Sequence, residues 1–186
     1  NLKLGSTSST LTLTPSDSNV ASNFTLPQVT AATSGANYDT PTASGPVPGD
    51  TGTGATNYGY LYNWPAATAG ETQASKPAGS SAATNSICPK SWHLPTGDST
   101  GELQTLYVAM GSSAASWNYP GPFRGVLAGH WLNGFVSQSS SGFLWSSLPF
   151  SSTANNAFGA NFYSGYVFPG VKYGRSDGFS VRCLLN

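Results

Sequence analysis

The two histidines, His93 and His130, are the side chains of this sequence best suited to acid–base chemistry near neutral pH. A histidine that acts as a general base needs a partner that orients it and a group that it can activate. Serines are plentiful, but the chain contains no Gly-x-Ser-x-Gly turn, and spacing alone identifies no acidic partner. Trp92 and Leu94-Pro95 flank His93, so a packed or hydrogen-bonded histidine is the favoured interpretation and a catalytic His93 the weaker alternative. We therefore expect no catalytic residues.

The two cysteines, Cys88 and Cys183, lie 95 positions apart. Neither has a second Cys or His at the spacing of a zinc site, so one long-range disulfide is predicted. A disulfide favours an oxidising compartment, and we expect the protein to be extracellular or on a cell surface. The chain begins with Asn1 and shows no signal-like segment, so we expect an export signal to have been removed or the sequence to start within a longer protein.

Metal and cofactor sites are not expected. Hard cations prefer clustered carboxylates, and the seven acidic residues are scattered: Asp17, Asp39, Asp50, Glu71, Asp98, Glu102 and Asp177. Residues 96–102 (TGDSTGE) contain several oxygen ligands, and calcium there is an alternative. Capping of a following helix explains the same residues more simply.

Composition excludes several classes of partner. Charged residues make up 8% of the 186 positions, and seven basic side chains balance seven acidic ones. Nucleic-acid binders cluster Lys and Arg on one surface, so we expect no nucleic-acid partner. No apolar run approaches about 18 residues, so we expect no membrane-spanning segment. The aromatic content of 12% is nevertheless enough to fill a hydrophobic core.

A change of composition near residue 57 divides the chain. Before it, residues 11–14 and 24–26 alternate as short strands do, and residues 33–57 have the Gly, Pro, Thr and Asp content of a loop. We expect residues 1–57 to form a strand-and-loop extension rich in Thr, Ser, Gly and Pro. Residues 58–186 are expected to form the domain.

The second part is predicted to hold one clear helix followed by strands. Leu103, Leu106, Tyr107 and Met110 recur at helical spacing, and Gly111 ends the pattern. A shorter helix is expected at 65–67. Strands are expected at 58–64, 123–132, 142–147, 157–163, 165–173 and 178–185. Helix first and antiparallel sheet after it indicate the α+β class.

Other side chains in this part are interpreted as structural. The inward-facing sheet residues are expected to be Trp92, Leu94, Trp145, Phe179 and Val181. Gly142 and Gly178 precede strands, where a positive φ is often required. Arg182 is interpreted as an ion-pair or carbonyl partner, with binding of a ligand carboxylate as the weaker alternative.

Four motifs, in order, resemble the Fibrobacter succinogenes major paralogous domain, a module of exported bacterial proteins. They are YGYLYNW (58–64), ICPKSWHLPT (87–96), GFLWSS (142–147) and SDGFSVRC (176–183). The resemblance covers residues 58–185. Through the Leu-Pro-Thr helix start and the closing Gly-Phe-x-x-Arg-Cys pattern, it extends distantly to the formylglycine-generating enzyme group. It implies a C-type-lectin-like fold, with short helices packed on a twisted antiparallel sheet with long loops.

Residues 148–175 combine aromatic side chains with Asn, Ser and Gly, a mixture typical of recognition surfaces. Alternation assigns Phe158, Phe162 and Val167 to the core. The candidate ligand-binding residues are Tyr163, Tyr166, Phe168, Tyr173 and Arg175.

These features together predict a non-catalytic bacterial surface protein that binds a protein or glycan ligand through its aromatic loops. The alternative is a structural subunit of an extracellular filament or surface layer. That alternative rests on residues 1–57, which could self-assemble if an exposed strand completes the sheet of a neighbour.

Overall fold

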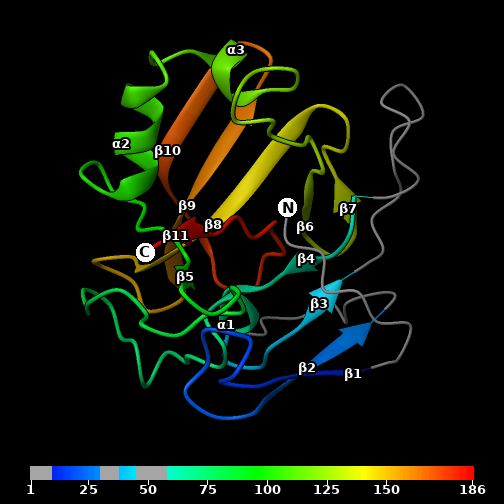
Figure 1. Cartoon of the computed structure of the whole chain (residues 1–186), viewed down its shortest axis with the longest axis vertical. Helices are drawn as coiled ribbons and strands as arrows, with labels where there is room; N and C mark the ends of the chain where they lie inside the picture. The colour runs from blue at the N-terminus through cyan, green and yellow to red at the C-terminus, as the bar shows by residue number, and fades with distance from the viewer. Residues whose placement is uncertain (1–9, 30–37, 45–57) are drawn as a thin grey trace.

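The structure, a computed structural model, describes residues 10–29, 38–44 and 58–186 (Figure 1). Within these ranges the fold is mixed, with small sheets that are mostly antiparallel and a few short helices, as the predicted α+β class requires. None of the described helices is long and apolar enough to cross a membrane.

The largest described strands form an antiparallel sheet in the order β10-β9-β8. They are β8 (Ser141–Pro149), β9 (Asn156–Tyr163) and β10 (Tyr166–Gly174), close to the strands expected from sequence. Two helices, α2 (Glu102–Ala109) and α3 (Ala114–Trp117), pack against this sheet (Figure 1). The sheet therefore has one face beneath these helices and a second face turned away from them.

Helix α2 packs through the side chains that its periodicity predicted. Leu103 is buried, and Leu106, Tyr107 and Met110 pack at the edge of the same cluster. Across from them, the sheet contributes a set of buried residues: Leu144, Ala160, Phe162 and Val167. The helix and the strands thus bury one continuous apolar layer.

The N-terminal residues join the same fold. Strands β1 (Thr10–Leu13), β2 (Phe24–Val29), β3 (Ala43–Ser44) and β4 (Leu61–Tyr62) form a four-stranded sheet in chain order, with β2 and β3 parallel. Leu13, Leu26 and Ala43 are buried in one cluster with Trp64 and Trp145. In the described residues, the composition change near residue 57 is therefore not a break in packing, and the N-terminal strands share the main core.

The remaining described elements are short: α1 (Trp64–Ala67), β5 (Trp92–His93), β6 (His130–Trp131), β7 (Phe135–Val136) and β11 (Leu184–Leu185). The side chain of Asn63 caps α1 by accepting from the backbone N–H of Ala66 at 3.1 Å. Strands β5 and β11 pair with each other, as do β6 and β7.

The long strands expected at 123–132 and 178–185 are wrong. Arg124 and Gly129 have positive φ angles of 52° and 69°, which interrupt an extended strand. Residues 178–180 make isolated bridges to three different partners, Trp131, Tyr62 and Leu144. This segment therefore runs between several sheets and joins none of them as a long strand.

Gly142 and Gly178 are needed for close approach, and the expectation of a positive φ at both was wrong. Neither is among the glycines with positive φ. A Cβ added at Gly142 would collide with the Phe162 ring, and one at Gly178 would lie 2.7 Å from the Cβ of Trp131. Both glycines let a neighbouring aromatic residue pack directly on the backbone.

Candidate functional site

Three aromatic side chains gather at the end of the β9–β10 hairpin. Ring centroids of Tyr163 and Tyr166 are 5.5 Å apart, those of Tyr163 and Phe168 6.2 Å, and those of Tyr166 and Phe168 6.1 Å. Tyr166 is 61% exposed and Phe168 42% exposed, whereas Tyr163 is half-buried. We call these three residues the aromatic patch.

Strand alternation places the patch on the face of the sheet turned away from α2. Val167 pairs with Phe162, and both are buried in the layer beneath the helix. Residues adjacent in a strand point to opposite faces, so Tyr166 and Phe168 point away from that layer. Tyr163 pairs directly with Tyr166 and shares its face.

Tyr173 lies on the same face as Phe168 but is only partly exposed, because its ring packs against the main core. Its ring contacts Phe143 and Phe179, with centroid distances of 5.8 and 4.8 Å. Burial, with a further contribution from the charge of Asp177, raises the pKa of Tyr173 to about 12. The segment that carries Phe179 covers this end of the sheet face and leaves the other end open.

Arg175 is fully buried, so its expected role as a surface contact was wrong. Its guanidinium donates hydrogen bonds to three backbone carbonyls, those of Asn156 at 3.2 Å, Thr72 at 3.3 Å and Lys76 at 2.6 Å. Burial lowers the pKa of Arg175 to about 10, although the nearby charges of Asp39 and Glu71 oppose this shift. The side chain has a structural role, joining β9 and β10 to residues 72–76.

A neighbouring loop carries another exposed tyrosine, which is not among the binding residues expected from sequence. The side-chain amide of Asn118 donates to the backbone carbonyl of Tyr163 at 2.9 Å, which ties this loop to the end of the hairpin. The next residue, Tyr119, is 66% exposed. The aromatic run Trp117-Asn118-Tyr119 was the sequence signal for it, since exposed Tyr next to Asn is typical of binding surfaces.

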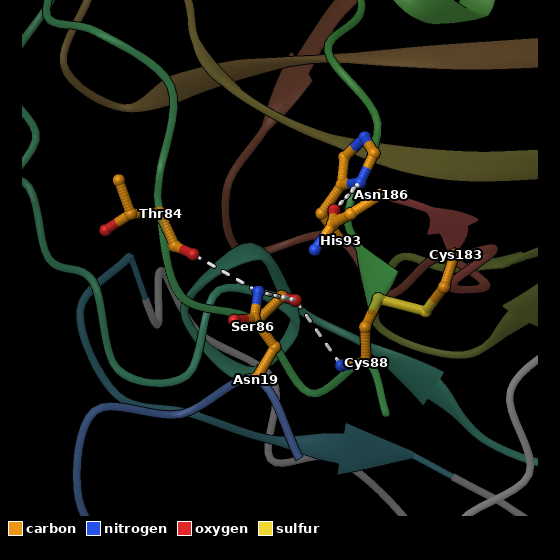
Figure 2. Close-up of a disulfide and its surroundings, with 7 residues drawn as sticks. All are labelled: Asn19, Thr84, Ser86, Cys88, His93, Cys183 and Asn186. Carbon is orange, nitrogen blue, oxygen red and sulfur yellow. Dashed lines mark hydrogen bonds between the residues drawn. A yellow bond between two sulfur atoms is a disulfide. The ribbon is translucent and has the colours of Figure 1, made fainter. Parts of the chain in front are cut away.

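The predicted disulfide between Cys88 and Cys183 is confirmed, with the two Cα atoms 5.8 Å apart (Figure 2). Close by, the side chain of Asn19 donates to the carbonyl of Thr84 and to the hydroxyl of Ser86, both at 3.2 Å. The N-terminal region is thereby held against the segment that leads to Cys88. One bridge thus joins the residue just before β11 to the centre of the chain.

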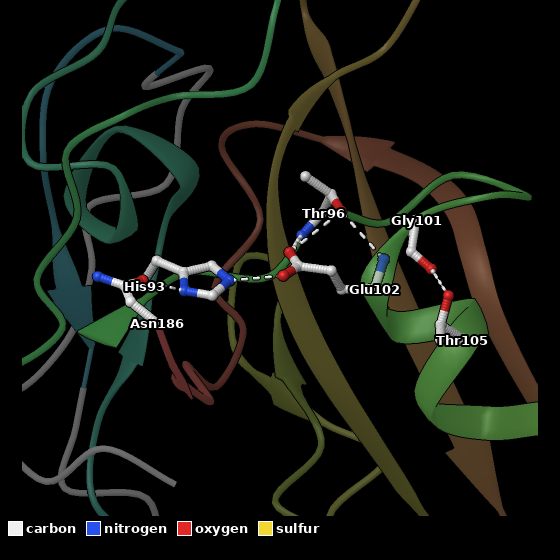
Figure 3. Close-up of polar contacts among 6 residues, drawn as sticks. All are labelled: His93, Thr96, Gly101, Glu102, Thr105 and Asn186. Carbon is white, nitrogen blue, oxygen red and sulfur yellow. Dashed lines mark hydrogen bonds and ion pairs between the residues drawn. The ribbon is translucent and has the colours of Figure 1, made fainter. Parts of the chain in front are cut away.

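His93 is hydrogen-bonded on both sides of its ring (Figure 3). Its Nε2 atom lies 2.7 Å from Oε1 of Glu102, and its Nδ1 atom lies 2.5 Å from Oδ1 of Asn186. The acidic partner that spacing could not identify is therefore Glu102. Both ring nitrogens are occupied by these contacts, which link the start of α2 to the strand pair β5–β11.

Glu102, the first residue of α2, also exchanges hydrogen bonds with Thr96. Its Oε2 accepts from the backbone N–H of Thr96 at 2.9 Å, while the Thr96 hydroxyl accepts from the N–H of Glu102 at 3.0 Å (Figure 3). Partial burial raises the pKa of Glu102, but the hydrogen bonds from Thr96 and His93 outweigh it and hold the pKa below its usual value. Asp98 accepts from Thr100 in the preceding turn. Thr96, Asp98 and Glu102 thus accept local hydrogen bonds, and the Thr96 hydroxyl caps the first N–H of α2. The described residues contain no group of three His, Cys, Asp or Glu side chains able to hold a metal.

His130 packs among aromatic rings. Its ring centroid is 4.4 Å from that of Phe143 and 6.0 Å from that of Phe179. Burial lowers the pKa of His130, so its neutral form is favoured in the fold. This histidine contributes to packing.

Four of the five sheet residues expected to face inward are buried. Leu94, Trp145, Phe179 and Val181 are buried as expected, but Trp92 is exposed and faces solvent beside Leu185, its partner in β11. The two-stranded pair β5–β11 lies at the surface, which sequence alternation alone could not show.

Arg182 is confirmed as a carbonyl partner, because it donates to the carbonyl of Phe123 at 3.0 Å and its guanidinium carbon lies 4.6 Å from the centre of the Phe123 ring.

Comparison with protein-family profiles, with curated proteins and with solved structures finds no match to this chain.

Proposed function

We propose that this protein is an exported binding module that recognises its ligand through the aromatic patch. The observation that supports this most strongly is the contact among the rings of Tyr163, Tyr166 and Phe168 at the open end of the sheet face, where Tyr166 and Phe168 are exposed. An exposed cluster of large apolar side chains carries a hydration cost, and such clusters on protein surfaces mark interaction sites. Ligand binding relieves that cost.

The patch has the properties of an efficient recognition surface. Tyr and Phe each have two side-chain torsions, so fixing them on a ligand costs little conformational entropy. Paired strands hold their backbone, with Tyr163 opposite Tyr166 and Asn161 opposite Phe168. The hydrogen bond from Asn118 further fixes the end of the hairpin. The surface is therefore largely preorganised, which favours affinity.

Binding without catalysis is the proposed mode of action. In the part of the chain that the structure describes, His93 and Glu102 form an acid–base pair, and both have further partners, Glu102 with Thr96 and His93 with Asn186. We further propose that the fold is C-type-lectin-like and that residues 58–185 belong with the Fibrobacter succinogenes major paralogous domain. The disulfide supports an extracellular or cell-surface location, since such bonds persist in oxidising compartments.

An array of glycans and proteins tests the proposal. Parent protein is compared with the variants Tyr166→Ala and Phe168→Ala, and Val108→Ala on the exposed side of α2 is the matched control. We expect each patch variant to lose about 1–2 kcal/mol of binding free energy to the captured ligand, while the control retains it. Equal binding by all four proteins would show that the recognition surface lies elsewhere.

A second candidate function is a subunit of a filament or surface layer. It is favoured by the position of β1, which is the outermost strand of its sheet among the described residues. Edge strands can pair with a strand from another chain. Sedimentation analysis separates the two functions, because a monomer favours the binding module and ordered polymers favour the filament subunit.

A further inference from the structure

The residues that pair with the aromatic patch in the sheet are uncharged. In the sheet, Ser141 lies opposite Tyr163 and Asn161 lies opposite Phe168, so the registered neighbours are neutral polar residues. Lys172, the one basic residue of β10, pairs with Phe158 on the other face, and its Nζ lies 5.3 Å from the centre of the Phe150 ring. Nucleic acids and anionic polymers require cationic contacts. An uncharged ligand is therefore complementary to this face.

The patch is small in comparison with protein–protein interfaces. A large aromatic side chain has about 150–250 Å² of surface that a partner can bury. At the exposed fractions of Tyr166 and Phe168, and with the half-buried Tyr163 added, the patch offers a partner roughly 300 Å². A stable protein interface buries about 800 Å² on each partner. The area suits a short stretch of a narrow polymer better than the surface of a folded protein.

The chemical groups of the patch match those of a sugar chain. The face of an aromatic ring is electronegative, and it attracts the polarised C–H groups that a pyranose presents on one side. The phenol hydroxyls of Tyr163 and Tyr166 can both donate and accept hydrogen bonds with sugar hydroxyls. The amide of Asn161 donates to the carbonyl of Gly142 at 3.2 Å, which fixes the orientation of this polar neighbour.

We infer that the ligand of the aromatic patch is a neutral polysaccharide. This inference rests on the proposed binding function and names its ligand class. Sugar rings pack on Tyr166 and Phe168, and their hydroxyls bond to Tyr163 and to the neutral side chains beside it.

Affinity electrophoresis tests the inference with defined probes. Native gels contain hydroxyethylcellulose, soluble starch, α-mannan, xylan or galactan, and the charged polymer alginate serves as a comparison. We expect at least one neutral polymer, but not alginate, to retard the parent protein. Tyr166→Ala and Phe168→Ala should each weaken binding roughly tenfold, while Val108→Ala migrates like the parent. Thermal melting of each variant verifies that it is folded.

The outcomes separate the ligand class from the binding function. Failure of every neutral polymer to retard the parent, or equal retardation of the parent and the patch variants, overturns the polysaccharide inference. If the patch variants nevertheless lose binding to a protein on the array, the proposed binding surface stands and only its ligand class is wrong. If they also bind every array partner as the parent does, the proposed function is wrong as well.

Discussion

The guanidinium carbon of Arg175 lies 4.2 Å from the centre of the Trp64 ring, inside the protein. The backbone of the two residues is also joined, since the N–H of Trp64 donates to the carbonyl of Arg175 at 2.9 Å. The indole N–H of Trp64 in turn donates to the carbonyl of Ser146 at 2.9 Å. This pair connects α1 with the end of β10 and with β8, and it explains why a charged residue is tolerated in the core.

Replacing Arg175 with alanine should strongly destabilise the protein. Three backbone carbonyls would each lose a donor, which for Lys76 is the one seen in the part of the chain that the structure describes, and the Trp64 ring would lose its cation, so we expect a loss of about 3–5 kcal/mol in the free energy of unfolding. Urea denaturation of Arg175→Ala measures it. The exposed Lys90 provides the control, because Lys90→Ala should change stability by less than about 0.5 kcal/mol. A loss below about 1 kcal/mol for Arg175→Ala would contradict the structural role.

Tyr173 and Tyr166 should respond differently to the same truncation. Tyr173→Ala removes a ring that packs on Phe143 and Phe179, and we expect it to lower stability by about 2–4 kcal/mol. Tyr166→Ala removes an exposed ring and should change stability by less than about 1 kcal/mol. Thermal melting compares the two. Similar melting temperatures for both variants would show that the two ends of this sheet face are equally covered.

The bridge between Cys88 and Cys183 should contribute substantially to stability. A closed loop near 100 residues restricts the unfolded chain, and the chain-entropy relation gives about 4.7 kcal/mol for it. We expect mass spectrometry of unreduced protein to show a single linked peptide pair, and the double variant Cys88→Ser, Cys183→Ser to melt at a lower temperature. Rapid alkylation of both thiols without denaturant would contradict the bridge and the proposed export.

Asp177 should make stability depend on pH in the acidic range. Burial raises the pKa of Asp177 from 3.8 to about 6, although a backbone hydrogen bond with Gly174 opposes the shift. The folded state then holds a proton that the unfolded state releases, so this residue lowers stability as pH rises from about 4 to 6. Asp177→Asn should be more stable than the parent at pH 7, by roughly 1–2 kcal/mol, because the carboxyl keeps some solvent contact.

Melting temperatures of the parent and Asp177→Asn at pH 4, 5, 6 and 7 isolate this effect. Glu102 and His130 also titrate with shifted pKa values, but they are present in both proteins and cancel in the difference. The advantage of the variant should vanish toward pH 4. A difference that stays constant over the whole range would show that Asp177 does not carry the shift.

Local patterns in the sequence determined several elements. The spacing of Leu103, Leu106, Tyr107 and Met110 defined helix α2 and its buried side, because helical periodicity is set by neighbours along the chain. The alternation of the aromatic hairpin likewise defined β9 and β10. The two cysteines had no partner other than each other, which was enough to predict the bridge.

Tertiary structure decided which parts of a surface remain open. Phe168 and Tyr173 lie on the same face of β10, but the segment that carries Phe179 covers only Tyr173. Strand alternation therefore could not show that Phe168 is the more exposed of the two. His93 and Asn186 are 93 positions apart, and only the pairing of β5 with β11 brings them together. The charge of Arg175 predicts a surface residue. Its burial is possible because backbone carbonyls about 100 positions earlier in the chain accept its hydrogen bonds. Sequence thus determined the period of each element, whereas coverage by distant segments, which local spacing does not record, determined what each side chain contacts.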